Sequence, residues 1–208
     1  MFFARDCAIL GGGRERSVEY FDVCDEQGEP TGEVVERGRA HREGIRHRTA
    51  HVWILRQRAD KTEILLQKRS RNKDSFPGLY DTSSAGHVPA GDEPLASALR
   101  ELEEELGLHA EAEDLHFIGT TENVYERRFH GALFRDNEYC RVYVYPRPVE
   151  TSALRLQPDE VERVDWFDLE AVRSEIGHSR ERFCVPRESL DLLRRFVESE
   201  AYRKGADR

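Results

Sequence analysis

The segment Gly86–Leu108 reads GHVPAGDEPLASALRELEEELGL, a glycine-rich turn followed by an acidic, leucine-rich stretch. At 100° per residue, its regularly spaced leucines fall within about 60° of arc on a helix, so this stripe should face the core. The stripe consists of Leu95, Leu99, Leu102 and Leu106. Glu101, Glu104 and Glu105 share one flank of the helix, whereas Glu103 projects from the other flank. The segment therefore predicts an amphipathic helix that holds three carboxylates close together.

These clustered carboxylates need a compensating charge, because like charges at this spacing destabilise a helix by about 0.2–0.5 kcal/mol per pair. A hard divalent cation is the natural partner, since Mg²⁺ takes oxygen ligands and often lies between carboxylates and substrate phosphates. A solvated acidic face would be an equal explanation if the helix stood alone. However, Gly86 and Gly91 bracket the preceding turn and permit close backbone approach, where a free carbonyl would supply a further ligand. The pattern therefore favours a metal site.

The same segment resembles the signature of the Nudix hydrolase superfamily: a Gly, five residues, a Glu, seven residues, then Arg-Glu-apolar-any-Glu-Glu-any-Gly-apolar. The residues at matching positions are Gly86, Arg100, Glu101, Leu102, Glu104, Glu105, Gly107 and Leu108. One position departs, because Asp92 stands where the family has Glu. In the family this acid orients the arginine of the motif, so Asp92 and Arg100 would form the equivalent pair. A match of this length is far more specific than a short motif.

This resemblance implies a Nudix-type α/β/α sandwich, in which the helix of the motif packs on a mixed β-sheet. It also implies that water attacks a diphosphate linked to some other moiety, X, with the assistance of Mg²⁺ or Mn²⁺. The implied metal ligands are Glu101, Glu104, Glu105 and the carbonyl of Ala85. Arg100 would be the orienting residue, and the general base would be Glu101 itself or an acid on a later loop, such as Glu138.

A second resemblance, to the isopentenyl-diphosphate isomerase branch of this superfamily, covers about residues 20–145. In the isomerases, three histidines and two late glutamates hold a metal, and a cysteine directly before Gly-His carries the proton chemistry. The positions that look like this metal set are His41, His47, His87, Asp136 and Glu138. The cysteine position, however, is Ala85, which can neither donate nor accept a proton. Together with the intact glutamate motif, Ala85 favours hydrolysis over isomerisation, while a non-catalytic binding or regulatory module stays a third alternative.

Basic residues near the acidic helix are the candidates for holding the diphosphate. Lys68 and Arg69 lead this cluster, and Arg71 and Lys73 are explained equally well by a solvated turn. His87, beside the glycine of the motif, is a candidate contact for substrate or metal. Because a lone histidine is more often a surface or capping residue than a ligand, His41 and His47 are weaker candidates.

The remaining chain predicts strands and helices in an α+β arrangement, with helices packed on a mixed sheet. The predicted strands are Tyr20–Cys24, Thr31–Val35, Thr49–Gln57, Thr62–Lys68, Asp81–Ala85, Leu115–Thr121, Tyr139–Tyr145 and Val161–Phe167. Two further helices are expected at Asp168–Ile176, with Asp168 as the N-cap, and at Glu188–Tyr202. Arg37–Arg48 has too little apolar periodicity for a core element, and Glu122–Glu138 reads as a long polar loop of the kind that often has a function.

The length of 208 residues predicts one domain, residues 18–208, after a flexible lead-in of residues 1–17 and with a C-terminal helical extension at about residues 168–204. The net charge of -9 argues against duplex nucleic acid as a partner, and the resemblance implies a small-molecule diphosphate substrate. Four isolated cysteines, no apolar run near the about 18 residues of a membrane span and no signal peptide predict a cytoplasmic protein without a membrane partner. The identity of X and the choice between a monomer and a homodimer stay open.

Overall fold

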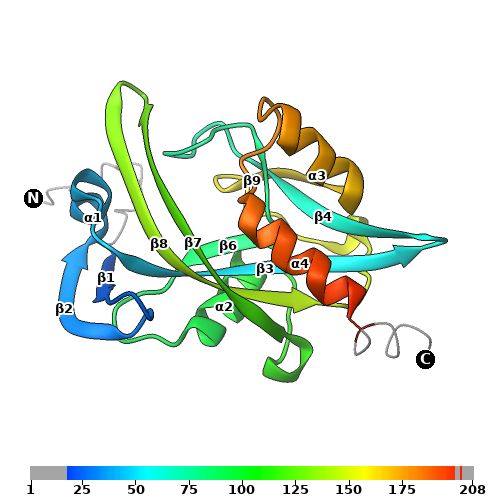
Figure 1. The fold of residues 1–208 in the computed structure, drawn as a ribbon, viewed down its shortest axis with the longest axis horizontal. Coiled ribbons are helices and arrows are strands. Elements are labelled where there is room, and N and C mark those ends of the chain that lie inside the picture. The colour runs from blue at the N-terminus through cyan, green and yellow to red at the C-terminus, as the bar shows by residue number, and fades with distance from the viewer. Residues whose placement is uncertain (1–17, 200–201, 203–208) are drawn as a thin grey trace, which may run out of the picture.

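The computed structural model describes residues 18–199 and 202, in which a mixed sheet is covered by helices (Figure 1). In chain order the elements are β1 (Tyr20–Cys24), β2 (Pro30–Glu36), α1 (Arg37–Glu43), β3 (His47–Arg58), β4 (Lys61–Arg69), β5 (Tyr80–Asp81), β6 (Ser84–His87), α2 (Pro94–Leu106), β7 (His116–Phe129), β8 (Ala132–Tyr145), β9 (Val161–Asp168), α3 (Leu169–His178) and α4 (Arg187–Glu198), with short 3-10 helices at Ala112–Asp114 and Thr151–Ala153. The predicted lead-in, residues 1–17, lies outside the described residues.

Strand β3 is the centre of the sheet. One of its edges pairs with β6 over Thr49–Val52 and with β4 over Ile54–Arg58, both antiparallel, while the other edge runs parallel to β8. Ser83 bridges the point where β4 and β6 separate, because its hydroxyl accepts from the Ile54 backbone N–H and donates to the Leu65 carbonyl. This fork places β6 and the turn after it at the position where α2 crosses the sheet.

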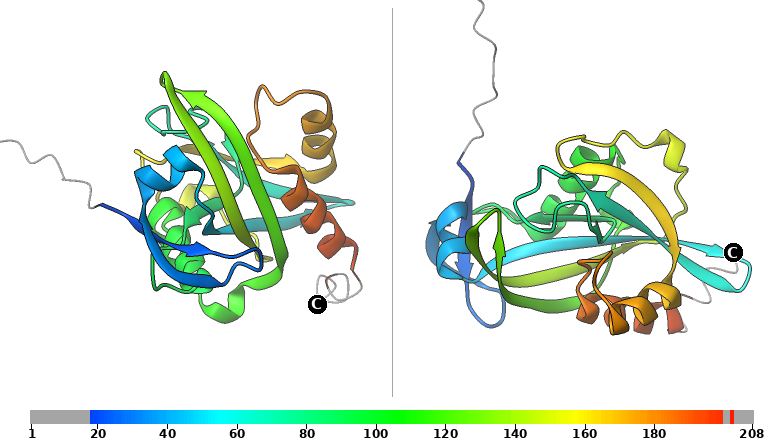
Figure 2. Two further views of the ribbon diagram at one scale, coloured as in Figure 1. Left: turned by 60° about the vertical axis from the view of Figure 1, so that its left-hand side comes forward. Right: turned by 90° about the horizontal axis from the view of Figure 1, so that it is seen from above.

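The helices lie on opposite faces of the sheet, α2 on one and α3 with α4 on the other (Figure 2). Leu102 and Leu106 of α2 are fully buried, and Leu95 and Leu99 pack partly buried against the same cluster, as the leucine stripe predicts. On the other face, the buried Trp53 indole donates to the hydroxyl of Ser189 on α4. The α/β/α sandwich with a mixed sheet is therefore confirmed.

Several predicted elements have the expected type and place. The β1–β2 and β3–β4 hairpins form, and Asp168 caps α3 by accepting a hydrogen bond from the Ala171 N–H at 2.7 Å. The short strand predicted at Asp81–Ala85 is divided into β5 and β6. The last helix, α4, ends at Glu198, and residues 200–201 and 203–208 lie outside the described residues.

Two predictions were wrong. The stretch Glu122–Glu138 is not a loop but most of the β7–β8 hairpin, which turns at His130 and Gly131 with φ values of 50° and 81°. Two successive positive φ angles match the right-handed twist of the two paired strands. The turn therefore keeps β7 and β8 paired along their full length, including the part that extends beyond the rest of the sheet. Likewise, Arg37–Arg48 does contribute to the core, because it forms α1 and the start of β3 and buries Ala40 and His41.

Candidate active site

Glu105 of α2 is buried against the β6 strand. Its Oε2 accepts hydrogen bonds from the Ser84 hydroxyl at 2.7 Å, the Gln67 amide at 3.2 Å and the Ala85 backbone N–H at 3.3 Å. Burial raises the pKa of Glu105 to about 7, although the Ser84 hydrogen bond opposes the shift. The carboxyl group is thus fixed in place and close to its ionisation midpoint at neutral pH.

Glu101 lies one helical turn earlier and covers Gly86. A Cβ at position 86 would overlap the carboxyl group of Glu101, so glycine is required there for the two to meet. Burial, together with the neighbouring charges of Glu105 and Glu104, raises the pKa of Glu101 to about 8. Glu104 is exposed beside this pair, and Glu103 is exposed on the other flank. The repulsion expected among these acids is therefore present at Glu101.

The loop before α2 and the end of α2 hold the glutamates in place. The Arg100 guanidinium donates to the Asp92 carboxylate at 2.9 Å, which is the pair expected from the motif. Gly107 ends the helix in the left-handed conformation, with φ of 64°, and its N–H donates to the Glu103 carbonyl. Both features fix where α2 begins and stops relative to β6.

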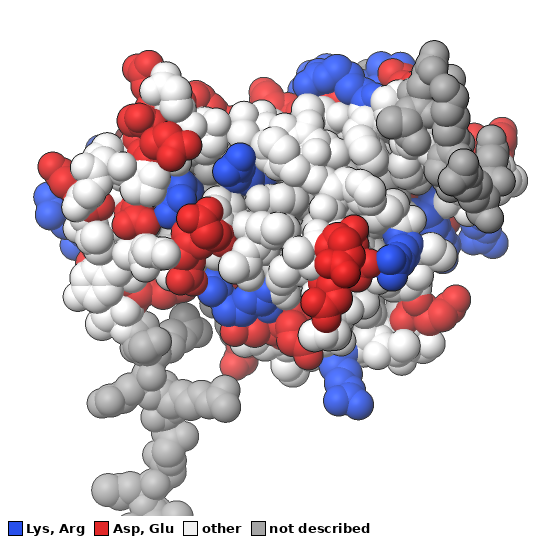
Figure 3. All heavy atoms as spheres, turned by 90° about the horizontal axis from the view of Figure 1, so that it is seen from below, with Lys and Arg blue, Asp and Glu red and all other residues white. Residues whose placement is uncertain are grey.

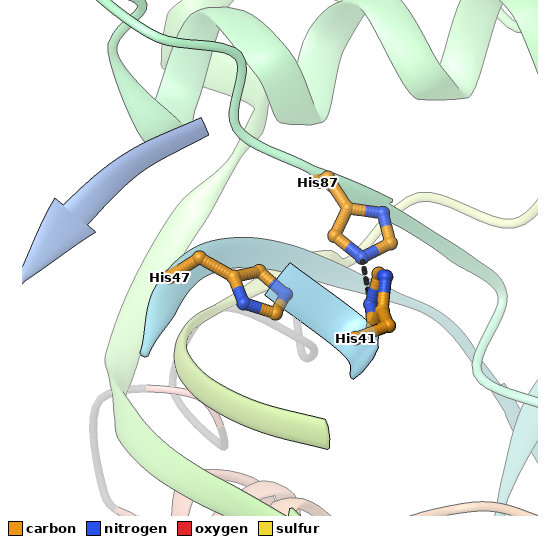
Figure 4. Close-up of side chains that lie close together, drawn as sticks. All are labelled: His41, His47 and His87. Atoms are coloured by element: carbon orange, nitrogen blue, oxygen red, sulfur yellow. Dashed lines mark hydrogen bonds between the residues drawn. The ribbon is translucent and has the colours of Figure 1, made fainter. Parts of the chain in front are cut away.

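Three histidines from three separate elements form a second polar cluster, which we call the histidine cluster: His41 of α1, His47 of β3 and His87 of β6. Figure 4 shows the three imidazoles gathered around a common space. Their ligand nitrogens lie within 4.8 Å of one another, and the Nε2 atoms of His41 and His87 are 3.3 Å apart. Two nitrogens bound to one Zn²⁺ ion at about 2.0–2.1 Å are about 3.3–3.4 Å apart in tetrahedral geometry.

Backbone carbonyls orient two of these rings. His41 Nδ1 lies 3.0 Å from the Arg37 carbonyl and His47 Nδ1 lies 2.8 Å from the Ile45 carbonyl, so each Nδ1 must be the N–H donor. Their Nε2 atoms then carry lone pairs directed at the common space. Burial supports this state, since it lowers the pKa of His41 to about 3 and of His47 to about 4. Such second hydrogen bonds typically orient histidines that bind metals.

Two buried acids of β8 complete the arrangement. Asp136 Oδ1 lies 3.8 Å from His47 Nε2, and neither buried atom has a hydrogen-bond partner. Glu138 offers a carboxylate oxygen within 4.8 Å of both and accepts from the Asn123 amide at 2.9 Å. Burial raises the pKa of Asp136 to about 6, and burial together with Asp136 raises the pKa of Glu138. Buried acids facing neutral imidazoles fit a divalent cation, because the cation would satisfy the orphaned atoms and stabilise the carboxylates.

The basic residues are arranged differently from the prediction. Lys68 pairs with Glu162 at 2.8 Å, and each guanidinium nitrogen of Arg69 is bound to Asp81 or Ser75. Lys73 pairs with Glu160, and its positive charge contributes to lowering the pKa values of Glu101, Glu105 and His87, against the larger effect of burial on the two glutamates. Within the predicted basic cluster, Lys73 is therefore the residue whose charge acts on all three of Glu101, Glu105 and His87.

The β7–β8 hairpin, which the sequence pattern predicts as a loop, contributes further residues to the site. Asn123 donates to Glu138, and the charge of Asp136 helps to raise the pKa of Tyr125, which is raised mainly by burial. Exposed and half-buried positions alternate along β7 in the structure, but most residues on both of its faces are polar, so the sequence carries no clear period-2 signal for a strand. His51 of β3, buried opposite Ala85 with an unpaired Nδ1, carried no signal that sets it apart from a core histidine.

None of the described helices combines the length and the apolar composition that crossing a bilayer requires. On the face seen in Figure 3, acidic and basic side chains of the described residues alternate rather than gather in a single basic patch.

Comparisons with known proteins give one consistent result. The sequence profile of the NUDIX domain matches residues 45–186. Nudix hydrolase 3 of Arabidopsis thaliana is 42% identical over 160 residues, which are 75% of this chain but 20% of that protein. An uncharacterized Nudix hydrolase of Clostridium acetobutylicum is 36% identical over 143 residues, or 69% of this chain and 66% of that protein. The chain thus spans a fifth of the first relative and slightly under two thirds of the second.

Solved structures share the fold at low identity. A protein of Deinococcus radiodurans superimposes with a TM-score of 0.61 at 17% identity, covering 85% of this chain and 98% of that one. The NUDIX domain of Shewanella oneidensis NrtR, solved as a complex with ADP ribose, has a TM-score of 0.51 at 17% identity, covering 73% of this chain and 86% of that one. Both support the architecture of the sheet and its covering helices.

Proposed function

Because this chain belongs to the Nudix family, we propose that it is a divalent-metal-dependent hydrolase that cleaves the diphosphate linkage of a nucleoside diphosphate derivative or another small organic diphosphate. The observation that carries the proposal is the pair of glutamates, Glu101 and Glu105, that α2 holds against Gly86 and Ser84. Their pKa values are raised by burial, so a bound cation would stabilise the ionised form that burial disfavours. This donor set is all oxygen, which suits Mg²⁺ or Mn²⁺.

In the proposed reaction, the oxygen of a water molecule forms a bond to one phosphorus atom, and the bond from that phosphorus to the bridging oxygen breaks. The leaving phosphate keeps the electron pair, and the proton of the water passes to a carboxylate. Glu101, which lies against Gly86, is the proposed acceptor of this proton, and Glu138 is the alternative base. When bound, the metal neutralises phosphate charge and lowers the pKa of its water.

We assign the ligands of the first cation to Glu101, Glu105, the exposed Glu104 and the carbonyl of Ala85. The histidine cluster and the Asp136–Glu138 pair would hold a second cation. Their mixed nitrogen and oxygen donors suit a borderline metal such as Mn²⁺ or Zn²⁺ better than Mg²⁺. Ala85, Gly86 and His87 are consecutive on β6, so the two sites would lie side by side along one strand. A diphosphate could then contact both.

Positive charge for the diphosphate would come from Lys73 and Arg37 in addition to the predicted Lys68 and Arg69. Arg37, paired with Glu19 at 2.6 Å, lowers the pKa values of His41, His47 and His87 and so lies on the side of the histidine cluster. Lys73 lies on the side of the glutamates. A phosphate group of the substrate would replace the Glu160 carboxylate as the partner of the Lys73 ammonium.

The test is mass spectrometry of the phosphate monoesters and inorganic phosphate formed from a panel of nucleoside diphosphate derivatives, ADP ribose among them, and of other organic diphosphates, with Mg²⁺ or Mn²⁺ in ¹⁸O-labelled water. We expect turnover that chelator abolishes and one labelled oxygen in a product phosphate. Silence on the whole panel with both metals would overturn the proposal in favour of a binding or regulatory module.

Isomerisation of an allylic diphosphate is the second candidate, and the assembled histidine cluster with its two acids favours it. Against it stands Ala85, whose methyl group cannot exchange a proton at the position that holds cysteine in the isomerases. Product analysis with isopentenyl diphosphate distinguishes the two activities: rearranged product without phosphate release would establish isomerisation. We expect the wild type to form no rearranged product, either with the metal or after the metal has been removed.

A further inference from the structure

Strand β1 lies between the histidine cluster and the turn that precedes α2. Its Phe21 is fully buried, and the Phe21 ring stacks on the imidazoles of His47 and His87, with centroid distances of 4.9 Å and 4.6 Å. Successive residues of a strand point to opposite faces, and the next residue, Asp22, reaches the turn before α2. The profile of the NUDIX domain begins to match at residue 45, so β1 lies outside the matched residues.

Asp22 binds this turn both directly and through an arginine. Its Oδ2 accepts from the Gly91 backbone N–H at 2.9 Å and from Arg48 Nη2 at 2.8 Å. The same Nη2 donates to the Asp92 carbonyl at 3.1 Å. We call these contacts the Asp22–Arg48 bridge. Its two side chains are 12% and 9% exposed, so salt and water compete little with it.

Arg48 repeats on β3 the division that β1 shows. It directly follows His47, so one residue faces the histidine cluster and the next faces the turn before α2. The two steps, Phe21–Asp22 and His47–Arg48, lie on neighbouring strands, because β1 pairs with β3 at His47. The bridge therefore links the histidine cluster with the turn that sets the start of α2, and α2 carries the paired glutamates.

The turn has little packing behind it, so these polar contacts matter. A cavity of about 410 Å³ borders the turn over residues 91–94. Upstream, the Ala90 N–H donates to the Tyr20 carbonyl of β1 at 2.8 Å. Within the part of the chain that the structure describes, the Asp22–Arg48 bridge supplies the contacts that tie the peptide groups of Gly91 and Asp92 to the sheet. The bridge thus fixes where α2 begins.

Of the paired glutamates, Glu101 depends more on where α2 begins. Glu105 is held by the hydrogen bonds that it accepts from β4 and β6. Glu101 lies one turn nearer to the start of α2 and meets Gly86 by packing. A shift of the first turn of α2 would therefore move Glu101 relative to the histidine cluster while Glu105 stays in place.

We propose that Asp22 and Arg48 are positioning residues: they set the distance between Glu101 and the histidine cluster, and so the spacing of the two cations that these groups would hold. This inference rests on the proposed function, in which one diphosphate contacts both sites. Each cluster forms without the bridge, because helical spacing gathers the glutamates and strand pairing gathers the histidines. The bridge acts on their separation, and misplacing a reacting group by about 1 Å can cost about 100-fold in rate.

The test removes the bridge without leaving a buried charge. The double variant Asp22→Leu, Arg48→Met exchanges a buried ion pair for apolar side chains, a change that proteins often tolerate. We expect cooperative thermal unfolding as in the wild type and a kcat lowered by about 10–100-fold. The Zn²⁺ affinity of the histidine cluster should stay within about twofold, and the Mg²⁺ affinity should fall by less than kcat does. Unchanged kcat in the folded double variant would overturn the proposal.

Two further variants separate positioning from general stability. Arg48→Lys keeps a donor group at the bridge but loses the planar fork, so it should retain more of the wild-type kcat than the double variant does. The matched control is Arg56→Met with Glu63→Leu, because Arg56 also lies on β3 and pairs with a neighbouring strand at 2.6 Å, near the other end of β3. The control should keep the wild-type kcat. Equal losses in the control and in the bridge variant would refute the positioning role.

Electron paramagnetic resonance of the Mn²⁺-loaded chain tests the spacing without turnover, because the coupling between two Mn²⁺ ions falls steeply with their separation. We expect a coupled signal in the wild type and an altered coupling in the double variant. The same coupling in both would overturn the positioning role even in an active enzyme. An uncoupled wild type would also overturn it, since no fixed pair of cation sites would exist. An altered coupling in a chain that hydrolyses nothing would support the positioning role and reject the hydrolase.

Discussion

The two polar clusters of this protein are built in opposite ways. The glutamates of α2 lie within a single helical turn and a half, so one helix and one glycine turn bring them together. The histidine cluster and its acids come from α1, β3, β6 and β8, and only the pairing of β3 with β6 and β8 makes them neighbours. The first cluster is a product of helical geometry, and the second is a product of topology.

The clusters also differ in their donors and in their electrostatics. Burial raises the pKa values of the glutamates and lowers those of the imidazoles, so in both clusters it favours the neutral form. A cation would offset the carboxylate repulsion in the first cluster, whereas it would use lone pairs that already exist in the second. We therefore expect the glutamates to bind a hard cation and the histidines a borderline one.

Removing one glutamate should have the largest effect. Glu105→Gln keeps a carbonyl that can accept from Ser84 but removes the charge a cation needs. Loss of a group behind a metal ligand costs about 10–100-fold, so loss of the ligand itself should reduce kcat by more than about 100-fold. The metal-free variant should unfold at the same or a higher temperature than the wild type, because a buried charge has been removed.

Glu103→Gln is the control on the same helix, because Glu103 is exposed on the other flank. It should retain wild-type kcat under the conditions of the Glu105→Gln assay. Comparable losses in both variants would mean that the acidity of α2 as a whole, and not the buried pair, determines turnover.

Breaking the second cluster should affect metal choice more than fold. His47→Ala removes a nitrogen ligand and one of the two imidazoles that face Asp136 Oδ1, so affinity for Mn²⁺ or Zn²⁺ should fall about 10–100-fold while Mg²⁺ activation at the glutamates persists. Titration of the purified chain followed by calorimetry measures both. His178→Ala, an exposed histidine at the end of α3, should leave both affinities unchanged.

The same contrast explains what the sequence could predict. Local spacing, or the resemblance that the spacing carries, predicts four features of the structure. These are the leucine stripe, the flank shared by Glu101 and Glu105, the Asp92–Arg100 pair and the α/β/α sandwich. The placement of His41 and Lys73 does not, because it depends on which strands pair and on the hairpin that Glu122–Glu138 turned out to form. Polar strands that extend beyond the sheet have no buried face to generate a clear alternation, so periodicity alone missed them.

Stability of the metal-free protein should depend on pH through the same groups. The folded-state pKa values of Glu101 and Glu105, about 8 and about 7, exceed the ordinary value of 4.5, so the folded state binds more protons than the unfolded state above pH 4.5. Their stabilising contribution is full below pH 4.5 and is lost as pH rises through 7 and 8. His41 and His47 have the opposite sign, and their contribution is lost as pH falls from 6.5 towards 3.

Above pH 6.5 only the glutamates of these four residues still titrate, so the free energy of unfolding of the metal-free chain should fall by about 2–3 kcal/mol between pH 6.5 and 8. Urea unfolding with chelator present measures this change. Saturating Mg²⁺ should stabilise the protein more at pH 8 than at pH 6.5, because it binds the ionised carboxylates. The assignment of this pH dependence to Glu101 and Glu105 would be contradicted if the free energy of unfolding of the metal-free wild type did not change with pH. It would also be contradicted if the Glu101→Gln, Glu105→Gln double variant kept the wild-type slope.

The smallest effect should come from the pair that orients the glutamates, and this tests how far local geometry alone supports the first cluster. The Arg100 and Asp92 side chains are 35% and 42% exposed, and exposed ion pairs contribute about 0–1 kcal/mol. Arg48 also holds the Asp92 carbonyl at 3.1 Å, so the loop keeps a backbone anchor when the carboxylate is lost. Asp92→Ala should therefore lower kcat/KM by roughly two- to fivefold, and the kcat/KM of this variant should change little with salt concentration. Asp92→Glu should have the wild-type kcat/KM. If Asp92→Ala instead loses nearly as much activity as Glu105→Gln, a carboxylate must hold Arg100 for the glutamates to act. The first cluster would then depend, like the second, on a contact outside its own helical turn.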